Sequence, residues 1–267
     1  MKNVKKKIHD FIEHAKKDKV TFAVYVFLRI FVMAAMITQF FNKNYENVFL
    51  CIVTLVLFIL PDIIEIKFRV ELPGVMEVMI ILLIFAAAIL GEIYRYYLIF
   101  PLWDDILHGL NGFLAAAIGF SLVDILNRNE KITFKLSPFF VALVSFCFSM
   151  TIGVFWEFFE FAMDMIFKFD MQKDTIVHNI STIKLDPSGR NIPFIINDIQ
   201  SVTVNGKDLG LGGYLDIGLI DTMKDLIVNF IGAFVFSALG YFYIKKRGNS
   251  WWTKFFLIRK SESDCGK

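Results

Sequence analysis

Six long apolar runs constrain the fold of this chain more than any other feature. They cover residues 20–41, 47–66, 74–99, 104–126, 136–166 and 221–244. A helix needs about 20 residues to cross the hydrocarbon core of a bilayer, and every run is long enough. Hydrophobic residues make up 56% of the chain and charged residues 20%, whereas soluble domains are about a quarter charged. We therefore expect an all-α polytopic membrane protein, a bundle of about six transmembrane helices.

Polar segments flank this membrane domain, which we place at residues 20–244. Residues 1–19 carry seven lysines among apolar residues at helical spacing. This pattern predicts either a basic amphipathic helix on an anionic membrane surface or a solvated tail. Residues 245–267 form a basic tail, and its sequence WWTKFFLIRK suits the membrane interface because Trp prefers the headgroup level.

Basic residues are concentrated in alternate connections. The loops after the second and fourth runs contain Lys67, Arg69, Arg128, Lys131 and Lys135. The short loops on the opposite side offer only Lys43 and Arg95. Cytoplasmic loops carry an excess of Lys and Arg, so we expect both termini in the cytoplasm.

The only long polar connection, residues 169–220, falls on the outer side in this topology. It contains the sequence DPSGR and the pair Asn205-Gly206, each flanked by short β-branched runs. These are hairpin signals, and they predict a small extracytoplasmic β-hairpin cap between the fifth and sixth helices. A disordered loop is the alternative.

Polar residues within spans are informative because each costs a few kcal/mol near the bilayer centre. They form stripes at one end of several spans: Asp104, Asp105, His108 and Asn111 on the fourth, Glu157, Glu160 and Asp164 on the fifth, Asp221, Asp225 and Asn229 on the sixth, and Glu92 and Arg95 on the third. The predicted topology places all of them near the outer leaflet. Small residues such as Gly112, Gly153 and Gly232 continue the stripes inward, which predicts close helix packing beneath an outward-facing acidic pocket.

Crowded carboxylates cannot all stay ionised in a low dielectric, so either protons or a cation must neutralise them. The candidate metal ligands are Asp104, His108, Glu157, Glu160 and Asp225, a nitrogen and oxygen set that suits Zn²⁺, Mn²⁺ or Mg²⁺. Such a metal could activate water against a phosphate or ester. Without a metal, His108 oriented by a carboxylate could act as a general base. The candidate catalytic residues are then His108, Glu157, Glu160 and Asp225, with Asn229 orienting a partner group.

The same residues also allow structural interpretations. Asp104 and Asp221 begin helices, where aspartate caps free N–H groups. Capping does not explain Glu157, Glu160 or Asp164, which lie near a helix C-terminus, but solvation at the outer surface would. His108 could be a hydrogen-bonding structural histidine.

Two further pairs of charged residues have simpler expected roles. Glu92 and Arg95 are spaced as an intrahelical ion pair. Arg29 lies in the middle of the first span, where a carboxylate such as Glu77 would be a suitable partner.

Three segments resemble the YjdF family of bacterial inner-membrane proteins: GEIYRYYLIFPLWDDILHGLNGF at 91–113, WEFFEFAMD at 156–164 and DTMKDLIVNFIGA at 221–233. The LPD and ELPG sequences around the second span fit the same family. The resemblance covers roughly residues 55–240. It implies a multi-pass protein of the bacterial plasma membrane and no particular activity.

A looser likeness links the chain to the VanZ-like family, which is associated with glycopeptide-antibiotic resistance. Asp105 and His108, Glu157, and the Asp225, Asn229 and Gly232 series would match the polar positions of that family. Its basic residue before the last aspartate has no clear counterpart here unless Arg190 or Lys224 serves. This departure puts a shared mechanism in doubt.

Three functions remain open at this stage. The leading hypothesis is a pocket that binds or acts on an envelope lipid or lipid-linked substrate, as an enzyme or as a binding protein. The alternatives are a cation- or proton-coupled transporter and a non-catalytic membrane scaffold or sensor. The expected partners are membrane lipid and that substrate, with no nucleic acid.

Overall fold

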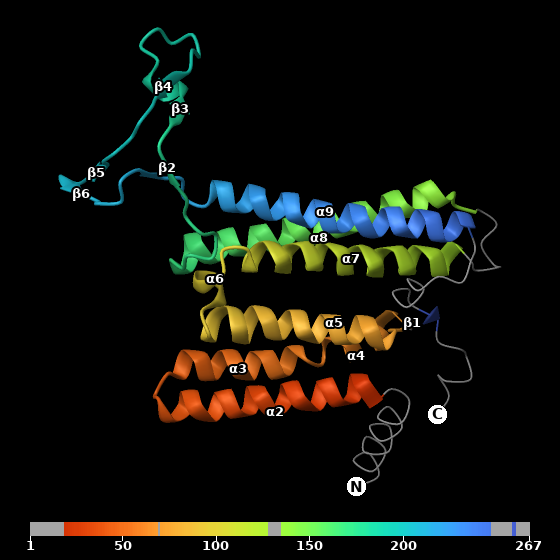
Figure 1. Ribbon diagram of the computed structural model, residues 1–267. Coiled ribbons are helices and arrows are strands. Elements are labelled where there is room, and N and C mark those ends of the chain that lie inside the picture. Colours follow the sequence, from red (N-terminus) through yellow and green to blue (C-terminus); the bar gives the residue numbers. More distant parts are fainter. Residues whose placement is uncertain (1–18, 69, 128–134, 247–257, 260–267) are drawn as a thin grey trace. The chain divides into compact units, whose positions relative to one another are not determined.

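The computed structural model describes residues 19–68, 70–127, 135–246 and 258–259. Within them, six helices are long and apolar enough to cross a membrane: Lys19–Phe41, Tyr45–Lys67, Gly74–Ile93, Trp103–Asn127, Pro138–Phe167 and Leu219–Lys245 (Figure 1). The predicted all-α polytopic fold is confirmed. The amphipathic segment predicted at 1–19, apart from Lys19, and most of the basic tail lie outside the described residues.

The chain divides into two compact units, residues 1–153 with 228–267, and residues 154–227. The first unit, called the helical unit below, contains α2 (Lys19–Phe41), α3 (Tyr45–Leu57), α4 (Leu60–Phe68), α5 (Gly74–Phe85) and α7 (Trp103–Asn127). It also holds the first half of α8 (Pro138–Phe167) and the second half of α9 (Leu219–Lys246).

Two apolar clusters form the core of the helical unit. One joins α2, α3, α5 and the following π-helix η1 (Ala86–Ile93) through residues such as Val32, Cys51 and Ile81. The other joins α5, α7, α8 and α9 through residues such as Phe120 and Phe236. Because α5 contributes to both apolar clusters, it connects them.

Two of the six spans are interrupted. The second span breaks between α3 and α4 at Phe58 and Ile59, just before Pro61, which cannot donate a backbone hydrogen bond. The Tyr25 hydroxyl of α2 donates to the carbonyl of Phe58 at this break. The third span changes from α-helix to the π-helix η1 at Ala86.

The third span ends earlier than the sequence predicts. It was expected to reach residue 99, but η1 ends at Ile93 and Arg95 adopts a left-handed conformation with φ of 59°. A separate short helix, α6, follows at Tyr96–Ile99. The predicted intrahelical ion pair between Glu92 and Arg95 is therefore wrong, because Arg95 lies beyond the end of the helix and both side chains are exposed.

Small residues bring α7, α8 and α9 together within the helical unit, as predicted. A Cβ added at Gly112 would lie 2.3 Å from the Asn229 carbonyl oxygen, and one at Gly153 would lie 2.6 Å from Asn229 Nδ2. The Ser149 hydroxyl donates a 2.7 Å hydrogen bond to the Gly112 carbonyl. These contacts need glycine because any side chain would separate the helix backbones.

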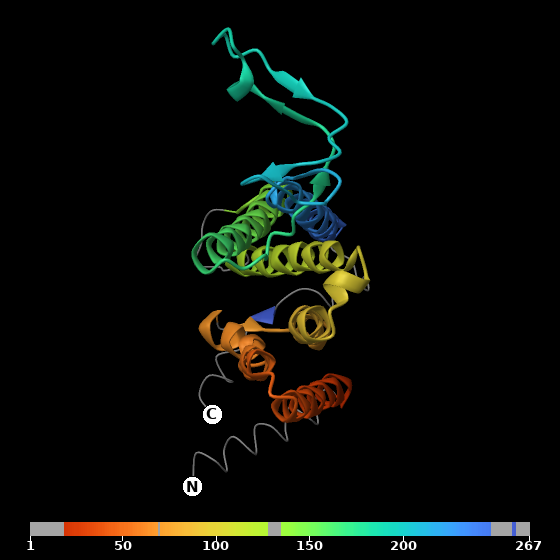
Figure 2. The same cartoon turned by 90° about the vertical axis from the view of Figure 1, so that its left-hand side faces the viewer.

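The second unit consists of the end of α8, the start of α9 and the connection between them (residues 168–218). This connection is called the outer arm below, after the outer side on which the sequence predicts it. The arm carries three antiparallel strand pairs: β2 (Ile176–Val177) with β7 (Tyr214–Leu215), β3 (Ile180–Thr182) with β4 (Phe194–Ile196), and β5 (Thr203–Val204) with β6 (Lys207–Asp208) (Figure 2). The predicted small strands are confirmed, and the DPSGR sequence joins β3 to β4.

The Asn205-Gly206 pair turns the β5–β6 hairpin. Both residues have positive φ, 51° and 80°, as a two-residue type I′ turn requires. The β-branched run before this turn, residues 199–204, forms a strand only at Thr203–Val204.

The last strand pair lies in the helical unit. There, β1 (Val70–Glu71) pairs antiparallel with β8 (Ile258–Arg259) from the basic tail.

Candidate carboxylate site

Three buried carboxylates meet in the second unit. Glu157 and Glu160 are three residues apart on α8 and therefore share one face of that helix, while Asp225 comes from α9. Their side chains are 4%, 7% and 1% exposed. One carboxylate oxygen from each lies within 4.8 Å of the others. We call these three residues the carboxylate triad.

The preceding residue of α8 supports the triad. Trp156 donates its indole N–H to Glu160 Oε1 at 2.8 Å, one helical turn later. A hydrogen bond of this kind fixes the carboxylate's rotamer and leaves its second oxygen for another interaction.

Other aspartates at the helix ends accept hydrogen bonds from the backbone of the outer arm. Asp164 accepts hydrogen bonds from the backbone N–H groups of Met171 and Gln172, at 2.7 and 2.8 Å. Asp221 accepts one from Lys173 at 2.8 Å. Asp164 and Asp221 were predicted as pocket residues, and the structure shows that both bond the backbone of the arm.

The start of α9 is capped by an aspartate that the sequence analysis missed. Asp216 accepts from the N–H groups of Gly218 and Ile220, at 3.3 and 2.7 Å. Its other bond, from Thr175 at 2.7 Å, holds the β2 side of the arm. Asp216 therefore precedes α9 and caps its first turn, within which Asp221 lies.

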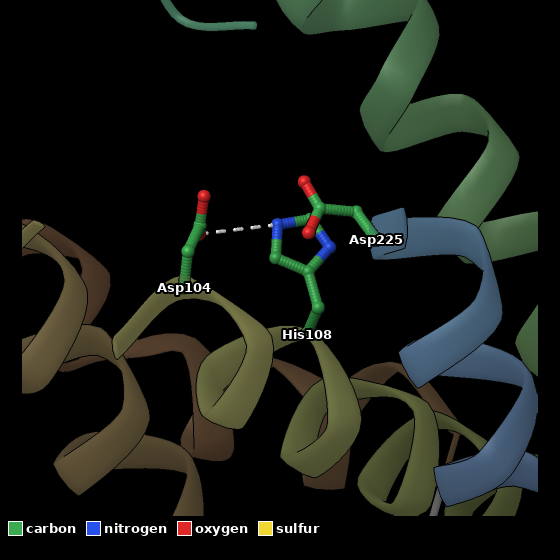
Figure 3. Close-up of side chains that lie close together, drawn as sticks. All are labelled: Asp104, His108 and Asp225. Atoms are coloured by element: carbon green, nitrogen blue, oxygen red, sulfur yellow. Dashed lines mark ion pairs between the residues drawn. The ribbon is translucent and has the colours of Figure 1, made fainter. Parts of the chain in front are cut away.

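The helical unit contributes a histidine–aspartate pair. His108 Nε2 lies 3.5 Å from Asp104 Oδ1, one turn earlier on α7 (Figure 3). The side chains are 10% and 27% exposed, respectively. A carboxylate at this distance can orient an imidazole and stabilise its protonated form, as a general base requires.

Asn229 sits where three helices of the helical unit meet. It is 1% exposed and contacts Gly112 and Gly153, and its Nδ2 lies 3.6 Å from the sulfur of Met150. Its Oδ1 is buried without a hydrogen-bond partner among the described residues. Asn229 therefore fills the helix crossing.

The remaining predicted pocket residues are less enclosed. Asp105 and Asn111 on α7 are half-buried, and Glu92 and Arg95 at the end of the third span are exposed. Glu92 lies in the π-helix η1 and Arg95 follows it, and the wider π-helical turns rotate the end of the span away from an ideal α-helical stripe.

The second unit is strongly acidic. Residues 154–227 contain eleven Asp and Glu against six Lys and Arg, a net charge of −5, whereas the whole chain is +2. In the arm, burial raises the pKa of the Asp174 carboxyl, and the neighbouring Asp170, Asp216 and Asp164 raise it further. This concentration of negative charge favours the approach of cations.

A family of membrane proteins matches most of the chain. The model of the family described as "Predicted membrane protein (DUF2238)" matches residues 24–246. The chain belongs to this family. YjdF is the family that this description covers, so the predicted resemblance to YjdF proteins is confirmed. The DUF2238 match includes all three residues of the triad. Searches of curated proteins and of solved structures gave no match.

Proposed function

We propose that this DUF2238 protein binds a divalent cation at the carboxylate triad and uses it to bind, or act on, the phosphate headgroup of an envelope lipid or lipid-linked substrate. The observation that carries the proposal is the burial of three carboxylates with ligand oxygens within 4.8 Å. Three ionised carboxylates repel one another strongly in a low dielectric, and a cation removes that repulsion.

The donor set favours a hard cation. All three ligand groups of the triad are carboxylate oxygens, which suit Mg²⁺, Mn²⁺ or Ca²⁺ better than Zn²⁺. Oxygens on opposite sides of Ca²⁺ lie about 4.8 Å apart, and those around Mg²⁺ about 4.2 Å. Three oxygens that lie within 4.8 Å of one another are therefore close enough to be drawn onto one ion by side-chain adjustment. Waters or substrate phosphate oxygens would complete the coordination shell.

His108 and Asp104 would supply the proton chemistry of the same function. Their 3.5 Å contact within one turn of α7 suits an imidazole that a carboxylate orients. The predicted roles are then His108 as general base or ligand, with Asp104 orienting it.

A lipid substrate suits the setting in a bacterial plasma membrane with both termini cytoplasmic. That topology places the acidic second unit on the outer side and the basic connections inside, in agreement with the positive-inside rule. Large apolar side chains around the triad, including Phe158 and Phe161 on α8, are 62% and 55% exposed and would face acyl chains.

Metal content tests the proposal directly. Purified protein is equilibrated with Mg²⁺, Mn²⁺ or Ca²⁺, and bound metal is measured by elemental analysis beside the triple variant Glu157→Gln, Glu160→Gln, Asp225→Asn. We expect about one ion per chain in the wild-type protein and none in the variant. Equal metal content in the two proteins would refute the cation site and leave protonated carboxyls as the neutralising groups.

A cation- or proton-coupled transporter is the second candidate. The two interrupted spans favour it, because broken helices line ion sites in many transporters. Arg29 lies 4.1 Å from the centroid of the Tyr25 ring, and the Tyr25 hydroxyl donates to the Phe58 carbonyl at the break of the second span. Flux of protons or cations into sealed vesicles, abolished by Glu160→Gln, would select this function over the enzyme.

A further inference from the structure

The π-helix of the third span is joined to the start of α7 by a tryptophan. Trp103 is the first residue of α7, and its indole N–H donates a 3.3 Å hydrogen bond to the carbonyl of Ala86. Ala86 is the residue at which the span changes from α- to π-helical hydrogen bonding. π-Helical turns occur frequently at functional sites because they displace the residues that follow them.

Aromatic contacts reinforce this junction. The Trp103 ring packs edge-to-face on Tyr96, with centroids 4.9 Å apart, and lies 6.3 Å from the ring of Phe100. In addition, Tyr97 packs directly on Gly91 of η1, where an added Cβ would lie 2.3 Å from the ring. The short helix α6 therefore packs between η1 and the first turn of α7.

The residue after Trp103 is Asp104, which pairs with His108 one turn later. The segment before Trp103 includes left-handed Arg95 and extended Phe100. The start of α7 is therefore not the continuation of a regular helix. The Trp103 side chain spans this gap and bonds the preceding membrane helix. We propose that Trp103 is a positioning residue that holds the first turn of α7, and with it the Asp104–His108 pair, against the π-helix. This inference rests on the role of His108 in the proposed function.

Chemical labelling of histidine tests the inference without an activity assay. The full-length protein in detergent is treated with diethyl pyrocarbonate, which modifies accessible neutral imidazoles, and each modified histidine is quantified by mass spectrometry. In Trp103→Phe, which keeps an aromatic ring but loses the N–H donor, we expect His108 to react about threefold to tenfold faster. That factor corresponds to the effect of one ordinary hydrogen bond on a local opening equilibrium.

His178 provides an internal reference. It lies in the outer arm, in the other unit, with Nδ1 3.0 Å from the Ile199 carbonyl, and its labelling rate should stay unchanged. Gly91→Ala is a second perturbation of the same junction, because it displaces Tyr97 from η1, and should also accelerate His108 labelling.

Gly119→Ala controls for loss of stability alone. Its added Cβ would lie 2.7 Å from Phe148, a clash on α7 more than two turns beyond His108. An unchanged His108 rate in both Trp103→Phe and Gly91→Ala would overturn the inference, as would an equal acceleration in Gly119→Ala. Metal content measured on the same samples reports on the triad separately, so failure of the cation site and failure of the positioning role are distinguishable.

Discussion

Gly232 of α9 and Gly109 of α7 touch backbone to backbone. A Cβ added at Gly232 would lie 2.0 Å from the carbonyl oxygen of Gly109, whereas one added at Gly109 would lie 3.7 Å from its nearest neighbour, the Val228 carbonyl. At this helix crossing, an added methyl group therefore clashes at Gly232 and fits at Gly109.

Gly232→Ala should destabilise the protein strongly, because the helices must separate to relieve the clash. We expect a loss of about 1–3 kcal/mol, the usual cost of overpacking a tight interior contact. The midpoint of thermal unfolding in detergent measures the effect. Gly109→Ala is the matched control and should leave the midpoint nearly unchanged. Equal losses in the two variants would contradict the described crossing.

Trp156→Phe should weaken cation binding at the triad without preventing it. The substitution removes the indole N–H that orients Glu160, and such supporting groups typically contribute a factor of about ten to a hundred in metal affinity. Isothermal titration calorimetry with Mn²⁺ measures the change. Phe158→Leu, which alters a lipid-facing aromatic on the same helix, should leave the affinity as it is; a similar loss there would assign the effect to general disturbance of α8.

The turn between β3 and β4 should survive mild acid because of Asp186. Hydrogen bonds from the Ser188 side chain and from the backbone of Ile192, Ser188 and Arg190 lower the pKa of Asp186 to about 2. A depressed folded-state pKa stabilises the turn above the ordinary aspartate value of about 3.9, and this stabilisation is lost as the pH falls toward 2.

Hydrogen exchange at the amides of Arg190 and Ile192 reports on this turn, after correction for the intrinsic pH dependence of exchange. Protection should persist from neutral pH to about pH 4 and disappear on approach to pH 2. Asp186→Ala should abolish the protection at every pH. Protection that survives this substitution would show that the loop is ordered by other contacts.

Asp174→Asn should stabilise the outer arm slightly at neutral pH. Burial and three neighbouring aspartates raise the pKa of Asp174. A raised folded-state pKa stabilises the folded arm below the unfolded-state value of about 3.9, and the benefit is lost as the pH rises through the folded-state pKa. The ionised side chain is therefore unfavourable at pH 7, where the neutral amide should raise the unfolding midpoint by about 1 °C.

The pH dependence of this gain is the decisive comparison. At pH 4 the two proteins should unfold at more similar temperatures, because part of the Asp174 population is then protonated. Asp198→Asn, a substitution at another aspartate of the arm, is the control. A gain that is the same at both pH values would rule out titration of Asp174 as its cause.

The hairpin signals in the arm were predictable because turn chemistry is local. Asn205 and Gly206 tolerate positive φ, and Asp186 bonds its own neighbouring backbone, so each acts within a few residues. The roles of Asp164 and Asp221 were not predictable in this way. Asp164 accepts from two backbone N–H groups beyond the end of its helix, and Asp221 accepts from one that lies 48 residues away. No periodicity in the sequence specifies these pairings.

The end of the third span was also not predicted correctly, for a different reason. Residues 74–99 are apolar enough for one continuous helix, and the sequence contains no proline or glycine cluster that marks a stop at residue 94. The π-helix at Ala86–Ile93 accompanies tertiary contacts, the Trp103 bond to Ala86 and the packing of Tyr97 on Gly91. Such contacts override intrinsic helix propensity, which differs by less than 1 kcal/mol per residue among ordinary residues.

By itself, the sequence determined six apolar spans, small residues at their crossings and a polar connection with hairpin turns. These are local properties, because each membrane helix must satisfy its own backbone hydrogen bonds and its own length requirement. Only the tertiary structure decided that Glu157, Glu160 and Asp225 turn toward one another while Asp164 and Asp221 bind the arm. The rotation of each helix about its axis determines which side chains face the other helices. That rotation depends on which side chains pack between helices, and this is a property of the assembled chain.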